Sequence, residues 1–304
     1  MPSDTKTYQE ETYIDNTIRL RGVLNTMPDF ARDYFRAIEP TTSPKTRISY
    51  AYDIRLFFQF LIEENPVYKH HSIKDFRVQD LEAIQPVDIE EYLEYLSYYV
   101  KDDGTEYTND ERGKRRKLAS LRSFYNYFFR DEQIKSNPAS LVPMPKLHDK
   151  EIVRLDPNEV AILLDQVEDR TKMTKSQMKF HDKTKVRDLA LLTLLLGTGI
   201  RVSECVGLDI SDVDFDNLAI KVRRKGGYED VVYFGEEVEE ALLSYLDQRK
   251  HMIPMSGHED ALFLSLQNRR MAVRSVENLV KKYASLVTTT KKITPHKLRS
   301  TYGT

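Results

Sequence analysis

The residues best suited to chemistry lie in the segment Gly197–Leu208, which reads Gly-Thr-Gly-Ile-Arg-Val-Ser-Glu-Cys-Val-Gly-Leu. Arg201 stands just past the Gly-Thr-Gly turn, at the start of a new helical pattern, and Glu204 follows three residues later. Residues three apart share one helical face, so the Glu204 carboxylate is placed to hold one side of the guanidinium. The other guanidinium donors remain available to an external anion, and a phosphate matches their planar arrangement.

Three further candidates follow in the C-terminal half of the chain. Thr294-Pro295 begins a helix that places His296 and Arg299 three residues apart on one face. Lys225 directly precedes Gly226-Gly227, in the turn between two short segments of alternating apolar residues. A lysine in such a turn is ordinarily only solvated, so its position alone assigns it no role.

Two segments concentrate positive charge, although the formal net charge of the whole chain is −2. Residues 112–122 contain six basic residues and no acidic one, and residues 269–299 contain nine basic residues against Glu277 alone. One such patch is ordinarily a solvated helix face, but two in one chain favour binding to the phosphate backbone of a nucleic acid. The expected backbone contacts are Arg112, Lys114, Arg115, Arg116, Arg122, Arg269, Arg270, Lys281 and Lys282.

A helix expected at residues 109–130 must present the first of these patches. At 100° per residue its apolar side chains fall within an arc of about 100°, and its arginines fall on a separate arc of about 120°. The apolar side chains are Leu118, Leu121, Tyr125, Phe128 and Phe129. One face of this helix is therefore expected to pack in a core while another follows a phosphate backbone.

The spacing of apolar residues predicts a mainly α protein with two domains. The first, residues 1–140, is helical, with residues 1–40 as an N-terminal extension, and residues 136–152 form a proline-rich linker. The second domain, residues 153–304, combines helices with a β-hairpin around Gly226-Gly227, where the apolar period changes from helical to two. The polar residues 171–185 are expected to form a loop.

Composition narrows the class of protein. With 40% hydrophobic and 31% charged residues, the chain has the composition of an ordinary soluble globular protein. The single cysteine, Cys205, excludes an internal disulfide framework and the cysteine-based zinc patterns, and is expected to be a small core residue. No apolar run approaches the roughly 18 residues of a membrane span, and the polar start does not resemble a signal peptide. We expect a soluble protein of the cytoplasm with no membrane partner.

Together, Gly199-Ile-Arg201-Val-Ser-Glu204, the hairpin that carries Lys225, and His296-Lys-Leu-Arg299 resemble the tyrosine recombinase (phage integrase) family, in particular its Xer-like bacterial members. The first motif alone would be weak, but the three elements in this order and at these separations are specific. The resemblance covers residues 152–304 and implies an α+β catalytic domain there, mostly helical with a small β-hairpin. It also implies that residues 1–140 are a core-binding domain that contacts DNA.

The resemblance further implies a chemistry. A tyrosine hydroxyl attacks a DNA phosphodiester, which gives a 3′-phosphotyrosyl link and a free 5′-hydroxyl that later attacks the partner strand. Arg201 and Arg299 would clamp the phosphate, with Glu204 orienting Arg201. Lys225 would protonate the leaving 5′-oxygen, and His296 would hydrogen-bond the phosphate or assist proton transfer. No cofactor and no metal are implied, because the bond energy is kept in the covalent intermediate.

The implied partner is a double-stranded DNA recombination site, bound by a homodimer and, at synapsis, by a homotetramer of the full-length protein. The implied location is the bacterial cytoplasm, in association with the nucleoid. Family members carry a Leu-Gly-His element and then the nucleophilic tyrosine some way after the His-x-x-Arg helix, whereas this chain stops at Thr304. We therefore expect a truncated recombinase that binds DNA without cleaving it.

Tyr302 is the one tyrosine near these residues that could replace the nucleophile. It lies three residues after Arg299 on the same expected helix, so it cannot readily reach in line behind the phosphate that Arg299 holds, and we expect it to be a packing residue. Two alternatives remain at this stage. One is a recombinase-derived DNA-binding protein or regulator that never had catalytic activity, and the other is an unrelated helical protein with chance matches.

Overall fold

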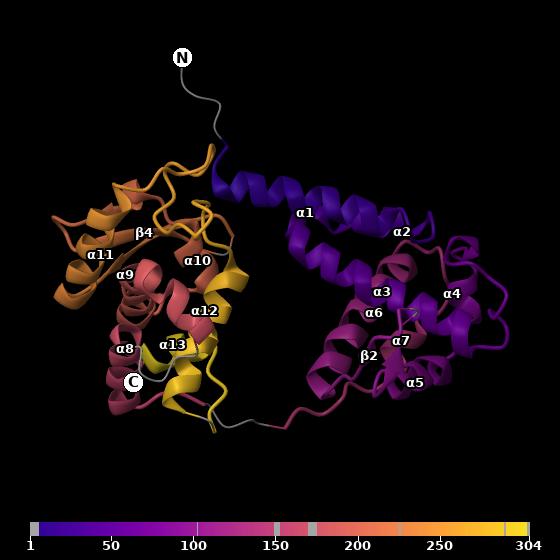
Figure 1. Cartoon of the computed structure of the whole chain (residues 1–304). Coiled ribbons are helices and arrows are strands. Elements are labelled where there is room, and N and C mark those ends of the chain that lie inside the picture. The colour runs from indigo at the N-terminus through magenta and orange to yellow at the C-terminus, as the bar shows by residue number, and fades with distance from the viewer. Residues whose placement is uncertain are drawn as a thin grey trace, which may run out of the picture. The chain divides into compact units, whose positions relative to one another are not determined.

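The computed structural model describes residues 6–101, 103–148, 153–169, 175–224, 226–288 and 290–302, without the side chains of residues 176 and 177. The chain divides into two compact units, whose described parts are residues 6–148 and 153–302. They are called the N-terminal unit and the C-terminal unit below (Figure 1). As the sequence predicted, the described part of the chain is mainly α-helical, with small antiparallel sheets.

The N-terminal unit is built from helices, with one small hairpin. Its core is aromatic and is centred on α3 and α6, which pack against each other, while α1 packs on α3. Its elements are α1 Tyr8–Leu24, α2 Ala31–Ala37, η1 Glu39–Thr41, α3 Pro44–Glu64, η2 Ile73–Asp75, α4 Asp80–Ala83, α5 Pro86–Tyr95, β1 Tyr99–Val100, β2 Glu106–Tyr107, α6 Glu111–Arg130 and α7 Pro138–Leu141.

The local signals in this unit explain where its two long helices begin and end. Ser43 caps α3 by accepting a hydrogen bond from the Thr46 N–H, Pro44 occupies the first helical position, and Asn65 ends the helix. Asp110 caps α6 in the same way, through the Gly113 N–H. The prediction that Leu118, Leu121, Tyr125 and Phe128 form a core stripe is confirmed. The prediction for Phe129 is wrong, because its side chain lies at the edge of the stripe and is exposed.

The proline-rich segment that the sequence predicted as a linker begins inside the N-terminal unit. Residues Pro138–Leu141 form the short helix α7, which packs against α5 and α6, and Pro138, Ala139 and Val142 are buried. The division between the two compact units falls later, between Asp149 and Lys150. Burial of Pro138, Ala139 and Val142 therefore holds residues 138–142 against the N-terminal unit.

The C-terminal unit is organised around the long helix α9, which packs against α8, α11 and α13. Its elements are α8 Pro157–Glu168, α9 Lys175–Thr198, α10 Val202–Gly207, η3 Ile210–Asp212, β3 Val213–Asp214, β4 Ala219–Arg223, β5 Glu229–Tyr233, α11 Glu236–Arg249, α12 Val273–Val287 and α13 Pro295–Tyr302. A side chain at Gly197 would meet Val238 of α11 at 2.5 Å, which explains why α9 and α11 require glycine where they touch.

The predicted loop at residues 171–185 is wrong for residues 175–185, which form the first turns of α9. Several of the polar side chains that are buried along this helix have polar partners. The His181 ring nitrogen Nε2 lies 2.7 Å from the Val167 carbonyl oxygen, and Arg187 pairs with Asp188 at 2.6 Å. Residues 171–174, the start of the predicted loop, lie outside the described residues.

The predicted β-hairpin is present and belongs to a three-stranded antiparallel sheet in the order β3-β4-β5. In the β4–β5 pair, Ile220 stands opposite Val232 and Arg223 opposite Glu229. Ile220 and Val222 are buried on the inner face of β4, as their alternation with polar residues indicated. In the described part of the chain, no helix is both long enough and apolar enough to cross a membrane.

Candidate functional site

Arg201 lies at the start of α10, immediately after the sharp turn at Gly199, whose φ of +59° requires glycine. Its backbone N–H donates to Glu204 Oε2 at 2.8 Å, and its Nη1 donates to Glu204 Oε1 at 2.6 Å. The carboxylate that reaches back to the first residue of a helix is half of a capping box. The side chain of Glu204 is 3% exposed and that of Arg201 is 49% exposed, so a buried anion orients a cation that faces solvent.

Glu204 also binds a second arginine that the sequence did not single out. Arg224 Nη1 donates to Glu204 Oε2 at 3.0 Å, and Arg224 Nε donates to Asp230 on β5, also at 3.0 Å. Burial alone would lower the pKa of the Arg224 guanidinium, but the hydrogen bond to Asp230 and the charge of Glu204 raise it above its ordinary value. The end of β4 is thereby tied to the start of α10.

His296 and Arg299 lie on α13 as predicted, at the first and last turns of this short helix. Arg299 Nη1 is buried and has no hydrogen-bond partner among the described residues. Such a nitrogen is a donor that lacks an acceptor, which is uncommon for a buried cation. His296 is exposed and lines a cavity of 870 Å³ together with Val202 of α10. The start of α13 and the start of α10 therefore face the same cavity.

The same cavity is lined by cations from two segments of the C-terminal unit. Lys281 and Arg274 come from α12, while Lys291 and Lys292 come from the segment before α13. Glu277 also lines it and binds Arg274 at 3.1 Å. The cavity that His296 and Val202 line is therefore basic, which suits an anionic ligand. Lys225, the fourth residue that the resemblance implied, lies outside the described residues.

The basic residues expected to contact a phosphate backbone differ in what they already bind. In α6, Arg112 is exposed, Lys114 donates to Ser97 at 2.6 Å, and Arg115 makes one long contact, 3.5 Å, with the Pro145 carbonyl. Arg122 donates to the backbone carbonyls of Ala139, Ser140 and Val142. Its guanidinium thus holds α7 in place and is half-buried.

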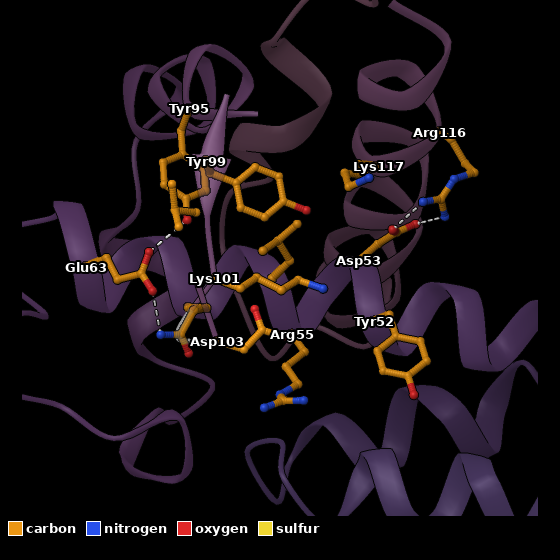
Figure 2. Close-up of a pocket in the computed structure, with 13 residues that line it drawn as sticks. Tyr52, Asp53, Arg55, Glu63, Tyr95, Tyr99, Lys101, Asp103, Arg116 and Lys117 are labelled. Carbon is orange, nitrogen blue, oxygen red and sulfur yellow. Dashed lines mark hydrogen bonds and ion pairs between the residues drawn. The ribbon is translucent and has the colours of Figure 1, made fainter. Parts of the chain in front are cut away.

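Arg116 is held by a buried carboxylate, as Arg201 is. Figure 2 shows both terminal nitrogens of Arg116 directed at Asp53 of α3, and Asp53 Oδ1 accepts from Nη2 at 2.7 Å. Asp53 also accepts from Ser120 at 3.2 Å. Burial raises the pKa of Asp53 above its ordinary value, and the charge of Arg116 partly offsets that rise. The pair lines a cavity of 590 Å³ between α3, α6 and the β1 strand, where Arg55 and Lys101 also lie.

The residues of the C-terminal unit that were expected to contact DNA also differ in what their side chains already bind. Lys281 is exposed on α12, and Arg269 is exposed with one contact, 3.2 Å from Nε to the Met255 sulfur. Arg270 donates to the carbonyls of Val206 and Leu208 and pairs with Asp209, so it holds the segment after α10. Lys282 is half-buried over the ring of Tyr283, and burial lowers the pKa of its amine.

The site shows no sign of metal or thiol chemistry in the part of the chain that the structure describes. No group of three His, Cys, Asp or Glu side chains there could hold a metal ion. Cys205, next to Glu204, is buried as predicted, and burial raises the pKa of its thiol to about 12. A thiol with so high a pKa is not a nucleophile at neutral pH.

Comparison with known proteins identifies the family. Residues 154–304 match the phage integrase family. The chain is 34% identical over 282 residues to the tyrosine recombinase XerC of Caldanaerobacter subterraneus subsp. tengcongensis, which covers 90% of this chain and 72% of that protein. It is 29% identical to the tyrosine recombinase XerS of Streptococcus agalactiae, over 91% of this chain and 84% of that protein. The chain belongs to the tyrosine recombinase family and is Xer-like.

Solved structures show the same fold. The lambda integrase dimer bound to a core site matches with a TM-score of 0.60 and 16% identity, over 90% of this chain and 87% of that chain. The Tn1549 transposon integrase in complex with circular intermediate DNA matches with a TM-score of 0.59 and 22% identity, over 90% and 84%. The mostly helical architecture with a small sheet is therefore a tyrosine recombinase fold.

Proposed function

We propose that the chain acts on duplex DNA as a site-specific recombinase that breaks and rejoins strands through a 3′-phosphotyrosyl intermediate. The observation that carries this proposal is the state of two arginines. Nε and Nη2 of Arg201, and Nη1 of Arg299, have no hydrogen-bond partner among the described residues. Two guanidinium groups with open donors, one of them braced by a buried carboxylate, suit the non-bridging oxygens of a phosphodiester.

The chemistry follows from where charge develops. When a tyrosine oxygen attacks phosphorus, negative charge grows on the non-bridging oxygens, and donors that are already oriented lower the barrier most. In this proposal Arg201 and Arg299 bind those oxygens, and His296 donates a hydrogen bond or assists proton transfer. Lys225 gives a proton to the 5′-oxygen as the bond from phosphorus to that oxygen breaks. Attack by a 5′-hydroxyl on the phosphotyrosyl bond reverses the step, so no nucleotide cofactor is consumed.

Tyr302 is not the nucleophile in this proposal. Its ring lies against the backbone at Gly199, where a side chain would come within 2.6 Å of Tyr302 Cδ1. Arg299 is one turn away on the same helix, so the two side chains cannot easily approach opposite sides of one phosphorus atom. We therefore propose that the 304-residue chain binds duplex DNA and does not cleave it.

The partner that we propose is a duplex recombination site, bound by a homodimer and at synapsis by a homotetramer, in the bacterial cytoplasm at the nucleoid. Support comes from relatives, because the matching lambda integrase structure is a dimer on a core site and the matching Tn1549 integrase structure contains DNA. Backbone contacts are proposed for the exposed cations Arg112, Arg115, Arg269 and Lys281, with Lys114, Arg116 and Lys282 beside them. Arg122 and Arg270 are proposed to hold backbone segments and not to contact DNA.

The test begins with duplexes that the 304-residue chain selects from a random pool. Binding is then measured over a range of salt concentrations, and a nicked duplex of the selected sequence is used to trap any covalent adduct. We expect an affinity that falls as salt rises, as phosphate contacts require, and no adduct. Arg201→Ala and Arg299→Ala are expected to bind the duplex with a modest loss. If the gene continues past codon 304, its full product is expected to form the adduct.

Three results would overturn parts of the proposal. A chain that binds no duplex even at low salt would remove the DNA-binding function. An adduct of the 304-residue chain that disappears in Tyr302→Phe would show that Tyr302 is the nucleophile. An adduct formed by the full gene product at the normal rate in Arg201→Ala or Arg299→Ala would remove the two arginines from the catalytic site.

A further inference from the structure

The two oxygens of the Glu204 carboxylate have different occupants. Oε2 accepts two hydrogen bonds, one from the backbone N–H of Arg201 at 2.8 Å and one from Arg224 Nη1 at 3.0 Å. Among the residues that the structure describes, Oε1 accepts only from Arg201 Nη1, at 2.6 Å. An arginine beside a carboxylate ordinarily forms two parallel bonds to both oxygens. Here the second oxygen is occupied, so Arg201 binds through one nitrogen.

Because Oε2 of Glu204 is occupied, part of the Arg201 guanidinium remains unbound by Glu204. A guanidinium has five N–H donors, and a bidentate contact with Glu204 would direct two of its nitrogens at that carboxylate. The single contact through Nη1 leaves Nε and Nη2 open among the described residues. The side chain of Arg201 is also half exposed, so those donors are reachable from solvent. Arg224 thus determines how much of Arg201 is available to an external anion.

Arg224 is itself fixed in place. Its side chain is 17% exposed, and its Nε is bound to Asp230 on the neighbouring strand β5. Its backbone N–H donates to the Tyr228 carbonyl at 2.9 Å across the hairpin turn. Because both ends of the residue are held, its guanidinium meets Glu204 at a set position and does not sample many rotamers.

We propose that Arg224 is a positioning residue: it occupies Oε2 of Glu204 and so keeps two donors of Arg201 directed at the phosphate. The proposal rests on the proposed function, since it concerns the same phosphate site. Arg224 does not touch the phosphate in this proposal and acts only through Glu204 and Arg201. Its neighbour Arg223 provides a matched control, because it also lies at the end of β4 and pairs with Glu229 at 3.3 Å, away from Glu204.

The experiment reads the guanidinium groups directly by ¹⁵N–¹H NMR of arginine Nε–Hε groups while inorganic phosphate is added. The proteins are the wild-type chain, Arg224→Ala, Arg224→Lys, Arg223→Ala, Arg201→Ala, and the double variant of Arg224→Ala with Arg201→Ala. The Arg201 resonance is assigned by its absence from Arg201→Ala. Circular dichroism of each variant checks the fold.

We expect Arg224→Ala to weaken phosphate binding by about tenfold, the loss that one charge-assisted hydrogen bond accounts for. Arg224→Lys keeps the charge but cannot bind Glu204 and Asp230 together, so its loss is expected to be smaller. Arg223→Ala is expected to bind phosphate as the wild type does. In the Arg201→Ala background, Arg224→Ala is expected to cause no further loss of phosphate binding. If Arg224 only stabilised the fold, its removal would weaken phosphate binding in both backgrounds.

The spectrum without phosphate provides an independent test. In Arg224→Ala the freed Oε2 accepts a second bond from Arg201, so the Arg201 Nε–Hε resonance is expected to shift before any phosphate is present. Two combinations of results would overturn the proposal, and both include an unshifted Arg201 resonance in Arg224→Ala. In the first, Arg224→Ala binds phosphate as the wild type does. In the second, Arg224→Ala weakens phosphate binding equally whether residue 201 is arginine or alanine. If the wild type binds no phosphate, the proposed phosphate site fails, and the phosphate-free shift still decides whether Arg224 positions Arg201.

Discussion

The ring of Tyr302 occupies the space that a side chain at Gly199 would need. A Cβ at Gly199 would lie 2.6 Å from Tyr302 Cδ1 and 2.9 Å from Cγ, closer than real contacts allow. Gly199 also has a φ of +59°, which side chains rarely adopt. The turn that presents Arg201 therefore meets the helix that carries His296 and Arg299 at a position where only glycine fits.

Gly199→Ala is expected to lower the free energy of unfolding by about 2–4 kcal/mol, since backbone strain and overpacking each contribute about 1–2 kcal/mol. Gly227→Ala is the matched control, because Gly227 also has a positive φ, +87°, but nothing lies within 4 Å of its Cβ position. Denaturant unfolding measures both. If the two substitutions destabilise the protein equally, the Tyr302 ring does not pack on Gly199. In the double variant of Gly199→Ala with Tyr302→Ala, the free energy of unfolding is expected to recover only the part that was lost to overpacking, because the backbone strain at position 199 remains.

Arg122 and Arg112 lie on the same helix and are expected to differ in what their removal changes. Arg122→Ala removes three hydrogen bonds to the carbonyls around α7, so the free energy of unfolding is expected to fall by about 1–3 kcal/mol. Arg112→Ala removes an exposed cation, so stability is expected to stay within about 0.5 kcal/mol of the wild type. DNA affinity is expected to fall in Arg112→Ala, and the slope of log affinity against log salt is expected to become shallower by about 1.

A loss of DNA affinity in Arg122→Ala at a temperature where the variant is fully folded would contradict this division. The sequence alone predicts the same role, contact with a phosphate backbone, for Arg112 and Arg122. Both lie in one basic run of α6 and on one arc of the helix. Their difference arises from the segment at residues 139–142, which packs beside Arg122 and offers it backbone acceptors.

Local geometry explains which features the sequence could predict. The contact between Arg201 and Glu204 spans three residues of one helix, so their spacing determines it, and the structure contains it at 2.6 Å. The helix at residues 111–130 and the hairpin follow from periodicity in the same way. The family resemblance likewise rested on short motifs at fixed separations.

Contacts between distant residues could not be predicted in this way. Arg224 meets Glu204 across 20 residues, and Arg116 meets Asp53 across 63, so each pair depends on how the helices and strands pack within its own unit. The same limit explains the missed start of α9. Its polar residues indicated a loop, but His181 is buried with its ring nitrogen Nε2 2.7 Å from the Val167 carbonyl oxygen, a contact across 14 residues that periodicity does not reveal.

Asp53 is expected to affect the stability of the fold and the orientation of Arg116 in different ways. Its carboxylate is buried and holds Arg116, yet burial raises its pKa above the ordinary value despite that partner. A raised pKa in the folded state means that the ionised form is less favourable there than in the unfolded chain. The contribution of Asp53 to stability is therefore fully present below its unfolded pKa and is lost as pH rises through its folded pKa.

Asp53→Asn keeps the shape of the side chain and removes its charge. Relative to the wild type, the variant is therefore expected to gain stability as the pH rises from acid towards neutral, and unfolding at a series of pH values measures this gain. At neutral pH the variant is expected to bind DNA less tightly, by about three- to tenfold, because Arg116 loses the charged acceptor that orients it. Arg116→Ala is expected to show a similar loss, and Asp53→Asn is expected to add nothing to it. Additive losses of DNA affinity would instead mean that Asp53 and Arg116 act on DNA separately.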